Sequence, residues 1–141
     1  MSKLEVLQKY IEARLKSNSA LSRAHIARSA HGLDGEVPSP DGVSIAVGMP
    51  LPERVSKYTA GAMFSEISFQ IEIAKKNISA SSPSALFFCE KVSAILNNWC
   101  APVESGYGKI FLCETSPWKI EKCDAHETRM SIAFKAQSLL Q

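Results

Sequence analysis

The chain has 141 residues, of which 45% are hydrophobic and 21% are charged, and its formal net charge is +2 at pH 7. These values are typical of a folded domain with a buried core and exclude a chain that is disordered throughout. The near balance of charge does not by itself indicate a nucleic-acid-binding protein. We therefore expect a single domain over residues 1–141.

The first segment, MSKLEVLQKYIEARL, carries charges along its length and lacks the apolar stretch of a signal peptide. No run approaches the roughly 18 apolar residues that a membrane-spanning helix needs. We expect an intracellular protein without a membrane partner, in which the cysteines stay reduced.

The same segment predicts an amphipathic helix of about 15 residues. Ser2 and Glu5 fit the S-x-x-E capping box that begins many helices. An apolar stripe follows at helical spacing, formed by Leu4, Leu7, Ile11 and Leu15. A helix this short is marginal alone, so we expect the stripe to pack on the rest of the chain.

The next two segments predict a loop and a strand. Residues 18–42 have weak periodicity and end in glycines and prolines; a short strand fits at 25–28, and the rest is typical of a loop. Val43, Ile45 and Val47 then alternate with small residues until Pro50, which predicts a strand. Residues 52–63 are polar and without a clear period, so we expect a second long, exposed loop.

Alternation is clearest in the stretch FSEISFQIEIA, which predicts a long strand over residues 62–75. One face is apolar and comprises Ile67, Phe69, Ile71 and Ile73. The other face is polar and comprises Glu66, Ser68, Gln70 and Glu72. A second helix is predicted after it, with Ser82 as N-cap and Pro83 at the first helical position. Its stripe consists of Ala85, Phe88, Cys89, Val92, Ile95, Leu96 and Trp99.

Three further strands are predicted near the C-terminus, in the stretches KIFLCET, WKIEKC and RMSIAFKA. The expected order is therefore α-β-β-α-β-β-β. It predicts an α+β fold with a mostly antiparallel sheet of four to five strands and two helices packed on one face. The apolar face of the 62–75 strand would then face the helices, and its polar face would point away from them.

Motifs that carry chemistry are missing from the sequence. Cys123 and His126 have a C-x-x-H spacing, but no second pair completes a zinc site. Cys89 falls on a helix stripe and Cys113 within an apolar strand, as is typical of structural thiols. We expect no metal, no cofactor and no catalytic residues, which favours a binding or assembly role.

The layout resembles the tail-terminator family of long-tailed bacteriophages and their prophages. The similarity rests on the order of SKLEVLQKYIEARL, VSIAV, LPERVSKYTAGAM, FSEISFQIEIAKKN, PSALFFCEKVSAILNNW and RMSIAFKA. It implies a non-enzymatic virion protein whose subunits form a ring, of six if the family pattern holds, that caps the tail tube and meets the connector. It also implies a location in the virion, and in the bacterial host cytoplasm during assembly. The segment 18–42 is longer than a minimal subunit needs, which leaves other head-tail joining or neck proteins as alternatives.

The resemblance implies two sets of contact residues. Ser68, Gln70 and Glu72 would line the ring lumen or a subunit interface, and acidic lumen residues would let DNA pass without binding. A solvated sheet face without a partner explains the same pattern. Arg54, Lys57 and Tyr58 would contact a neighbouring subunit or the tube, because Arg and Tyr are frequent at interface hot spots.

Two other classes of function stay open. A small nucleic-acid-binding adaptor would use a basic set formed by Arg23, Arg28, Lys75 and Lys76. An intracellular enzyme or small-molecule-binding protein would use His25, His31 or His126.

Overall fold

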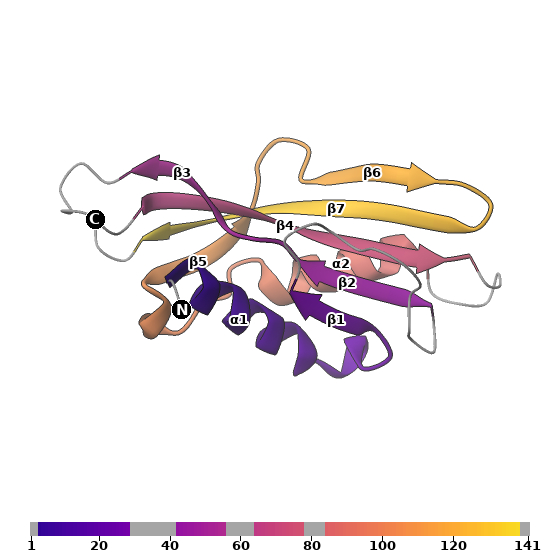
Figure 1. Cartoon of the computed structure of the whole chain (residues 1–141), viewed down its shortest axis with the longest axis horizontal. Coiled ribbons are helices and arrows are strands. Elements are labelled where there is room, and N and C mark those ends of the chain that lie inside the picture. Colours follow the sequence, from indigo (N-terminus) through magenta and orange to yellow (C-terminus); the bar gives the residue numbers. More distant parts are fainter. Residues whose placement is uncertain (1–2, 29–41, 56–63, 78–83, 139–141) are drawn as a thin grey trace.

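A computed structural model describes residues 3–28, 42–55, 64–77 and 84–138 (Figure 1). The first half of the chain forms α1 (Lys3–Lys16), the 3-10 helix η1 (Ser19–Leu21), β1 (His25–Arg28), β2 (Val43–Val47), β3 (Leu51–Val55) and β4 (Phe64–Lys76). The second half forms α2 (Ala85–Leu96), the 3-10 helix η2 (Val103–Ser105), β5 (Tyr107–Leu112), β6 (Trp118–Cys123) and β7 (Glu127–Ser138).

The two longest strands, β4 and β7, form the centre of the sheet. They are antiparallel, and their ladder runs from the pair Glu66–Gln137 to the pair Lys76–Glu127. Shorter strands flank this ladder. β2 and β6 lie beside one half of it, whereas β3 and β5 lie beside the other half. The long alternating stretch of β4 therefore sets the length of the whole sheet (Figure 1).

Within the described residues the sheet has seven strands in the order β1-β2-β4-β7-β5, with β3 added beside β4 and β6 added beside β7. Only β1 and β2 are parallel; the other pairs are antiparallel. The predicted α+β class and the mostly antiparallel sheet are confirmed. The sheet is wider than the four to five strands expected, because β1 and β3 also join it.

Both additional strands lie in segments that we expected to be mainly loop. The expectation of a loop from Pro52 onward is wrong as far as Val55, because β3 pairs with the first half of β4. Proline suits this position: β3 pairs on one side only, so a missing N–H need not break a ladder. In the segment 18–42, η1 and β1 are present, and β1 matches the short strand that the pattern allowed.

The helices cover one face of the sheet, as predicted. The α1 stripe residues Leu7, Ile11 and Leu15 are fully buried in the same core cluster as the apolar face of β4. Gln8 also faces inward, and its Nε2 donates to the carbonyl oxygen of Val47 at 2.8 Å. In α2, the N-cap is Ser84, whose hydroxyl accepts from the amide of Phe87, and not Ser82 as predicted.

The core lies between the helices and the sheet. The predicted inward face of β4, Ile67, Phe69, Ile71 and Ile73, is at most 3% exposed. On the neighbouring strand, Phe134 stacks on Phe69 with ring centroids 5.3 Å apart. Burial of this apolar surface is the main source of stability for the fold.

Candidate interaction surface

The face of the sheet that points away from the helices, here called the outer face, carries the predicted residues Ser68, Gln70 and Glu72. Strand alternation places them there, because their neighbours on β4 are buried against the helices. Gln70 is exposed, whereas Ser68 and Glu72 are half-buried. The structure thus brings the three residues to one face, and Gln70 is the most accessible of them.

Strand pairing adds residues that the sequence did not indicate. Ser68 lies between Leu51 on β3 and Lys135 on β7, and Lys135 in turn pairs with Phe111 on β5. A row of side chains therefore crosses four strands on the outer face. Leu51 is 57% exposed and Phe111 is half-buried. This row is apolar at both ends and polar in the middle.

Sequence reasoning could not find this row because its members lie on four strands. The stretch KIFLCET has apolar residues at adjacent positions, so alternation does not tell which of Ile110, Phe111 and Leu112 points outward. Leu51 follows Pro50 and precedes Pro52, where the strand was expected to have ended. The register between strands, which the sequence does not specify directly, supplies the missing information.

The outer face carries charges of both signs. Glu72 and Glu121 are acidic, and Lys119, Arg129 and Lys135 are basic, all on strands whose pairing places them on this face. The hydroxyl of Ser131 donates to Oε1 of Glu121 at 3.0 Å. A uniformly acidic surface that would repel DNA is therefore not present among the described residues. The mixed pattern is typical of a surface that contacts another protein.

In the other half of the outer face, next to β2, a group of small side chains is closed to solvent. Ser44, Ala46, Ala74 and Ser131 are at most 3% exposed. Their small side chains leave little that could project from this half. The accessible parts of the outer face are therefore the region around Leu51, Ser68 and Gln70 and the exposed residues of β6, Lys119 and Glu121.

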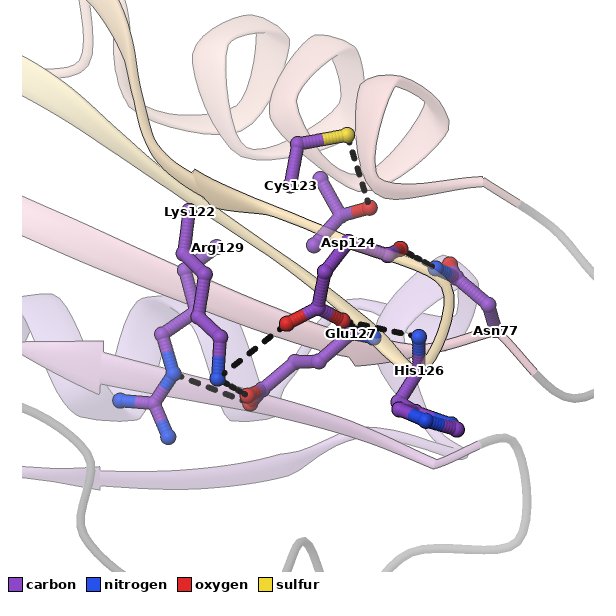
Figure 2. Close-up of polar contacts among 8 residues, drawn as sticks. Asn77, Lys122, Cys123, Asp124, His126, Glu127 and Arg129 are labelled. Atoms are coloured by element: carbon purple, nitrogen blue, oxygen red, sulfur yellow. Dashed lines mark hydrogen bonds and ion pairs between the residues drawn. The ribbon is translucent and has the colours of Figure 1, made fainter.

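A polar network forms the end of the β6–β7 hairpin (Figure 2). Oδ1 of Asp124 accepts hydrogen bonds from the backbone amides of His126 and Glu127 at 2.8 and 2.9 Å. These two bonds, together with the Lys122 ammonium, lower the pKa of the Asp124 carboxyl although its exposure leaves it accessible to water. The network holds the turn in one shape.

The hairpin end is also fastened to the rest of the sheet. Nδ2 of Asn77, at the end of β4, donates to the Asp124 carbonyl at 2.9 Å, and the Asn77 amide donates to the His126 carbonyl at 2.9 Å (Figure 2). On the hairpin itself, Glu127 accepts from Arg129 at 2.9 Å. The hairpin is therefore a fixed projection of the sheet.

The second set of predicted contact residues is only partly within the described chain. Arg54 belongs to β3 and pairs in the backbone register with Glu66. Lys57 and Tyr58 lie outside the described residues. The structure therefore brings Arg54 next to the strand that carries Ser68, at the edge of the outer face.

Two of the basic residues of the adaptor alternative already have contacts within the chain. Lys75 is 2% exposed, and its Nζ donates to the backbone carbonyl of Lys76 at 2.6 Å, so it is not available to a phosphate. Arg28 lies 3.8 Å from the Glu12 carboxylate. Lys75 and Arg28 are thus engaged within the chain, which weakens that alternative without testing it.

The histidines and cysteines form no reactive centre within the part of the chain that the structure describes. His25 and His126 lie on separate elements, and His31 is outside that part. No group of three His, Cys, Asp or Glu residues that could hold a metal occurs in the described ranges. Burial and the neighbouring Glu90 raise the pKa of the Cys89 thiol to about 11, so it is a protonated core group against Met130.

The described residues also contain no helix that is long and apolar enough to span a membrane.

Comparison with known proteins identifies relatives only at the level of the fold. No protein-family model matches the chain, and no curated protein matches it. A chain in the solved virion of a native gene transfer agent particle aligns with a TM-score of 0.68 and 18% identity, over 94% of this chain and 93% of that chain. A second solved structure, which has no functional description, aligns with a TM-score of 0.54 and 14% identity, over 99% and 96% of the two chains. This chain shares its fold with both over nearly their whole lengths.

Proposed function

We propose that this protein is a structural subunit of a phage-like virion. The observation that carries the proposal is the alignment with a chain of a gene transfer agent virion, which covers almost all of both chains. A shared fold alone does not fix a function. The surface of this chain adds support, because the sheet carries a partly exposed row of apolar and polar residues with Leu51 at one end.

Within that class we propose a tail-terminator or head-tail joining role. Subunits would associate head to tail and close into a ring, of six in the virion, that caps the tail tube and contacts the connector. Head-to-tail contacts use two different surfaces on each subunit, and they form a closed ring when the rotation between subunits permits it. The protein would act without catalysis, would assemble in the host cytoplasm, and would let DNA pass without specific binding.

The two surfaces of such a contact can be named. The outer face, with Leu51, Ser68 and Gln70, would be one surface. The segment with Arg54, Lys57 and Tyr58 would be the other, on the neighbouring subunit or toward the tube. The exposed Leu51 and the mixed charges favour contact of Ser68 and Gln70 with another protein. They do not favour a place for these residues on a lumen through which DNA passes. Glu72, next to the closed half of the face, would lie at the border of this contact.

The proposal is tested by size exclusion with light scattering over a range of concentrations, together with negative-stain images of any large species. Closed rings with a central hole are the expected result, in the free protein or after addition of purified tail tubes. A protein that stays monomeric under both conditions and binds DNA with a steep dependence on salt would instead support the adaptor function.

A further inference from the structure

The strand β6 is an exposed edge of the sheet. Among the described strands it pairs only with β7, and it runs along the upper rim of the molecule in Figure 1. Every residue of β6 after Trp118 is exposed. Its outward backbone N–H and C=O groups can therefore accept another strand.

Both ends of β6 are held in place. Nε1 of Trp118 donates to the hydroxyl of Ser93 on α2 at 3.0 Å, which fixes the start of the strand against a helix. The Asp124 turn and its bonds to Asn77 fix the end (Figure 2). An edge that is already ordered loses little conformational entropy when another strand adds to it.

The central residues of β6 alternate in a pattern that is complementary to itself. Lys119 pairs with Ser131 of β7, and Ser131 bonds to Glu121, so Lys119 and Glu121 share the outer face. Their charged atoms lie 3.9 Å apart. Ile120 points to the opposite face and is 64% exposed, the largest exposed fraction among the large hydrophobic residues that the structure describes.

We propose that two copies of this protein associate through their β6 strands, paired antiparallel about Ile120. In this register Ile120 lies opposite Ile120 of the second copy, and Lys119 lies opposite Glu121 twice. Opposite charges directly across an antiparallel pair stabilise it, and like charges destabilise it. The contact is two-fold symmetric, because each strand supplies the same three residues.

The charges select this register over its neighbours. A shift of two residues in one direction places Lys119 opposite Lys119, and a shift in the other direction places Glu121 opposite Glu121. A shift of one residue would place outer-face residues opposite inner-face residues. The β-bulge falls at Glu121 itself, which has no register partner on β7, so the regular pairing of β6 with a second copy extends no further than these three residues. Lysines discourage strands without matching acidic residues from docking on an edge, whereas a second copy presents Glu121 opposite Lys119.

This contact goes beyond the proposed ring and does not depend on it. A two-fold contact closes at two subunits, whereas a ring needs head-to-tail contacts. It also uses the β6 edge and not the row around Leu51. A dimer of the free subunit is therefore compatible with ring formation on a tail tube, and each can be tested alone.

Substitutions that reverse the charge of single β6 residues test the strand pairing while the fold is kept. The variants Lys119→Glu and Glu121→Lys each place like charges opposite each other in the homodimer, and both positions are exposed enough to tolerate the change. The double variant K119E/E121K restores opposite charges. Native mass spectrometry and light scattering measure the dimer fraction at low and high salt. Lys9→Glu, at an exposed position on α1, is the matched control.

The expected result is a dimer for the wild-type chain, the Lys9→Glu control and the double variant, and loss of the dimer for each single variant. A mixture of the two single variants should form a heterodimer, because each strand then faces only opposite charges. Added salt should weaken these dimers, because it screens the attraction between the opposite charges. Dimers that persist unchanged in both single variants, or the absence of any dimer or heterodimer, would overturn the proposal. Ring images of the same samples report separately on the proposed function.

Discussion

Gly48 lies where the chain passes from β2 to β3 beside the centre of β4. Its amide donates to the carbonyl of Gln70 at 2.8 Å, and a Cβ added at Gly48 would lie 2.6 Å from that oxygen. The obstacle is backbone, so it cannot rotate away. We expect Gly48→Ala to lower the free energy of unfolding by about 1–3 kcal/mol, as overpacking does elsewhere. Urea denaturation measures this change.

Gln70→Ala is the control for that prediction. It removes an exposed side chain and keeps the carbonyl that Gly48 contacts, so we expect a change within about 0.5 kcal/mol. Equal stabilities of the wild-type chain and Gly48→Ala would mean that the approach of the two strands is looser than the structure describes.

The lowered pKa of Asp124 makes part of the stability dependent on pH. The backbone amides of His126 and Glu127 hold the carboxyl in its charged form in the folded state. A group whose pKa is lower when folded stabilises the fold above its unfolded pKa, and this contribution is lost as the pH falls through the folded value. We expect the wild-type chain to be more stable than Asp124→Asn at neutral pH, and the difference to shrink in acid. Thermal melts of both proteins across this range measure the difference, and a gap that grows in acid would refute the assignment.

At the scale of elements, the β4–β7 ladder depends on the stacked pair Phe69 and Phe134. Phe134 is fully buried, so its truncation leaves a cavity. We expect Phe134→Ala to cost about 3–5 kcal/mol of unfolding free energy. Phe87 on α2 is 37% exposed, and Phe87→Ala should cost clearly less. Chemical denaturation of both variants compares the two stability losses. A larger loss in Phe87→Ala than in Phe134→Ala would contradict the placement of Phe134 in the core.

Besides its buried apolar stripe, α1 is joined to the end of β2 by a buried hydrogen bond from Gln8. Gln8→Leu keeps most of the volume but leaves the Val47 carbonyl without its donor. Leaving a buried polar group unpaired costs about 1–3 kcal/mol. We expect faster hydrogen exchange of the α1 amides in this variant, while the β4 and β7 amides stay protected. Unchanged exchange in α1 would show that its apolar stripe suffices.

Whether an element could be predicted depends on the sequence pattern that it contains. β4, α1 and the body of α2 have strong periodicity over many residues, so the sequence predicts them and their buried faces. β1 and β3 are short, and β3 contains Pro52; they become strands because a longer strand offers them an edge. The cap of α2 was assigned to Ser82 because Pro83 suits the first turn, whereas the hydroxyl that reaches an amide belongs to Ser84.

The candidate surface was predictable only in part. Alternation placed Ser68, Gln70 and Glu72 on one face of β4, but the residues beside them come from β3, β5 and β7. Pairing with Lys135 and the exposure of Leu51 depend on strand register and on the turn at Gly48. Those are tertiary properties, which local patterns do not contain. Consequently the face appeared polar in the sequence and has apolar ends in the structure.

At the scale of the whole molecule, the sheet separates two kinds of surface. The helices close one face, and the outer face and the sheet edges remain accessible. Heterologous contacts through the outer face would build a ring, whereas the β6 edge would pair two copies symmetrically. The first use belongs to the proposed virion role, and the charge pattern of β6 supports the second.

The most direct test of the account compares two exposed leucines on opposite sides of the molecule. Leu51 is 57% exposed on the outer face, and Leu86 is 52% exposed on α2. Each is changed to Asp, and ring formation by the free protein or on tail tubes is scored in negative-stain images. We predict that Leu51→Asp abolishes rings and that Leu86→Asp, with the same change in polarity, retains them. Rings that survive Leu51→Asp and disappear in Leu86→Asp would contradict the assignment of the outer face as the assembly surface.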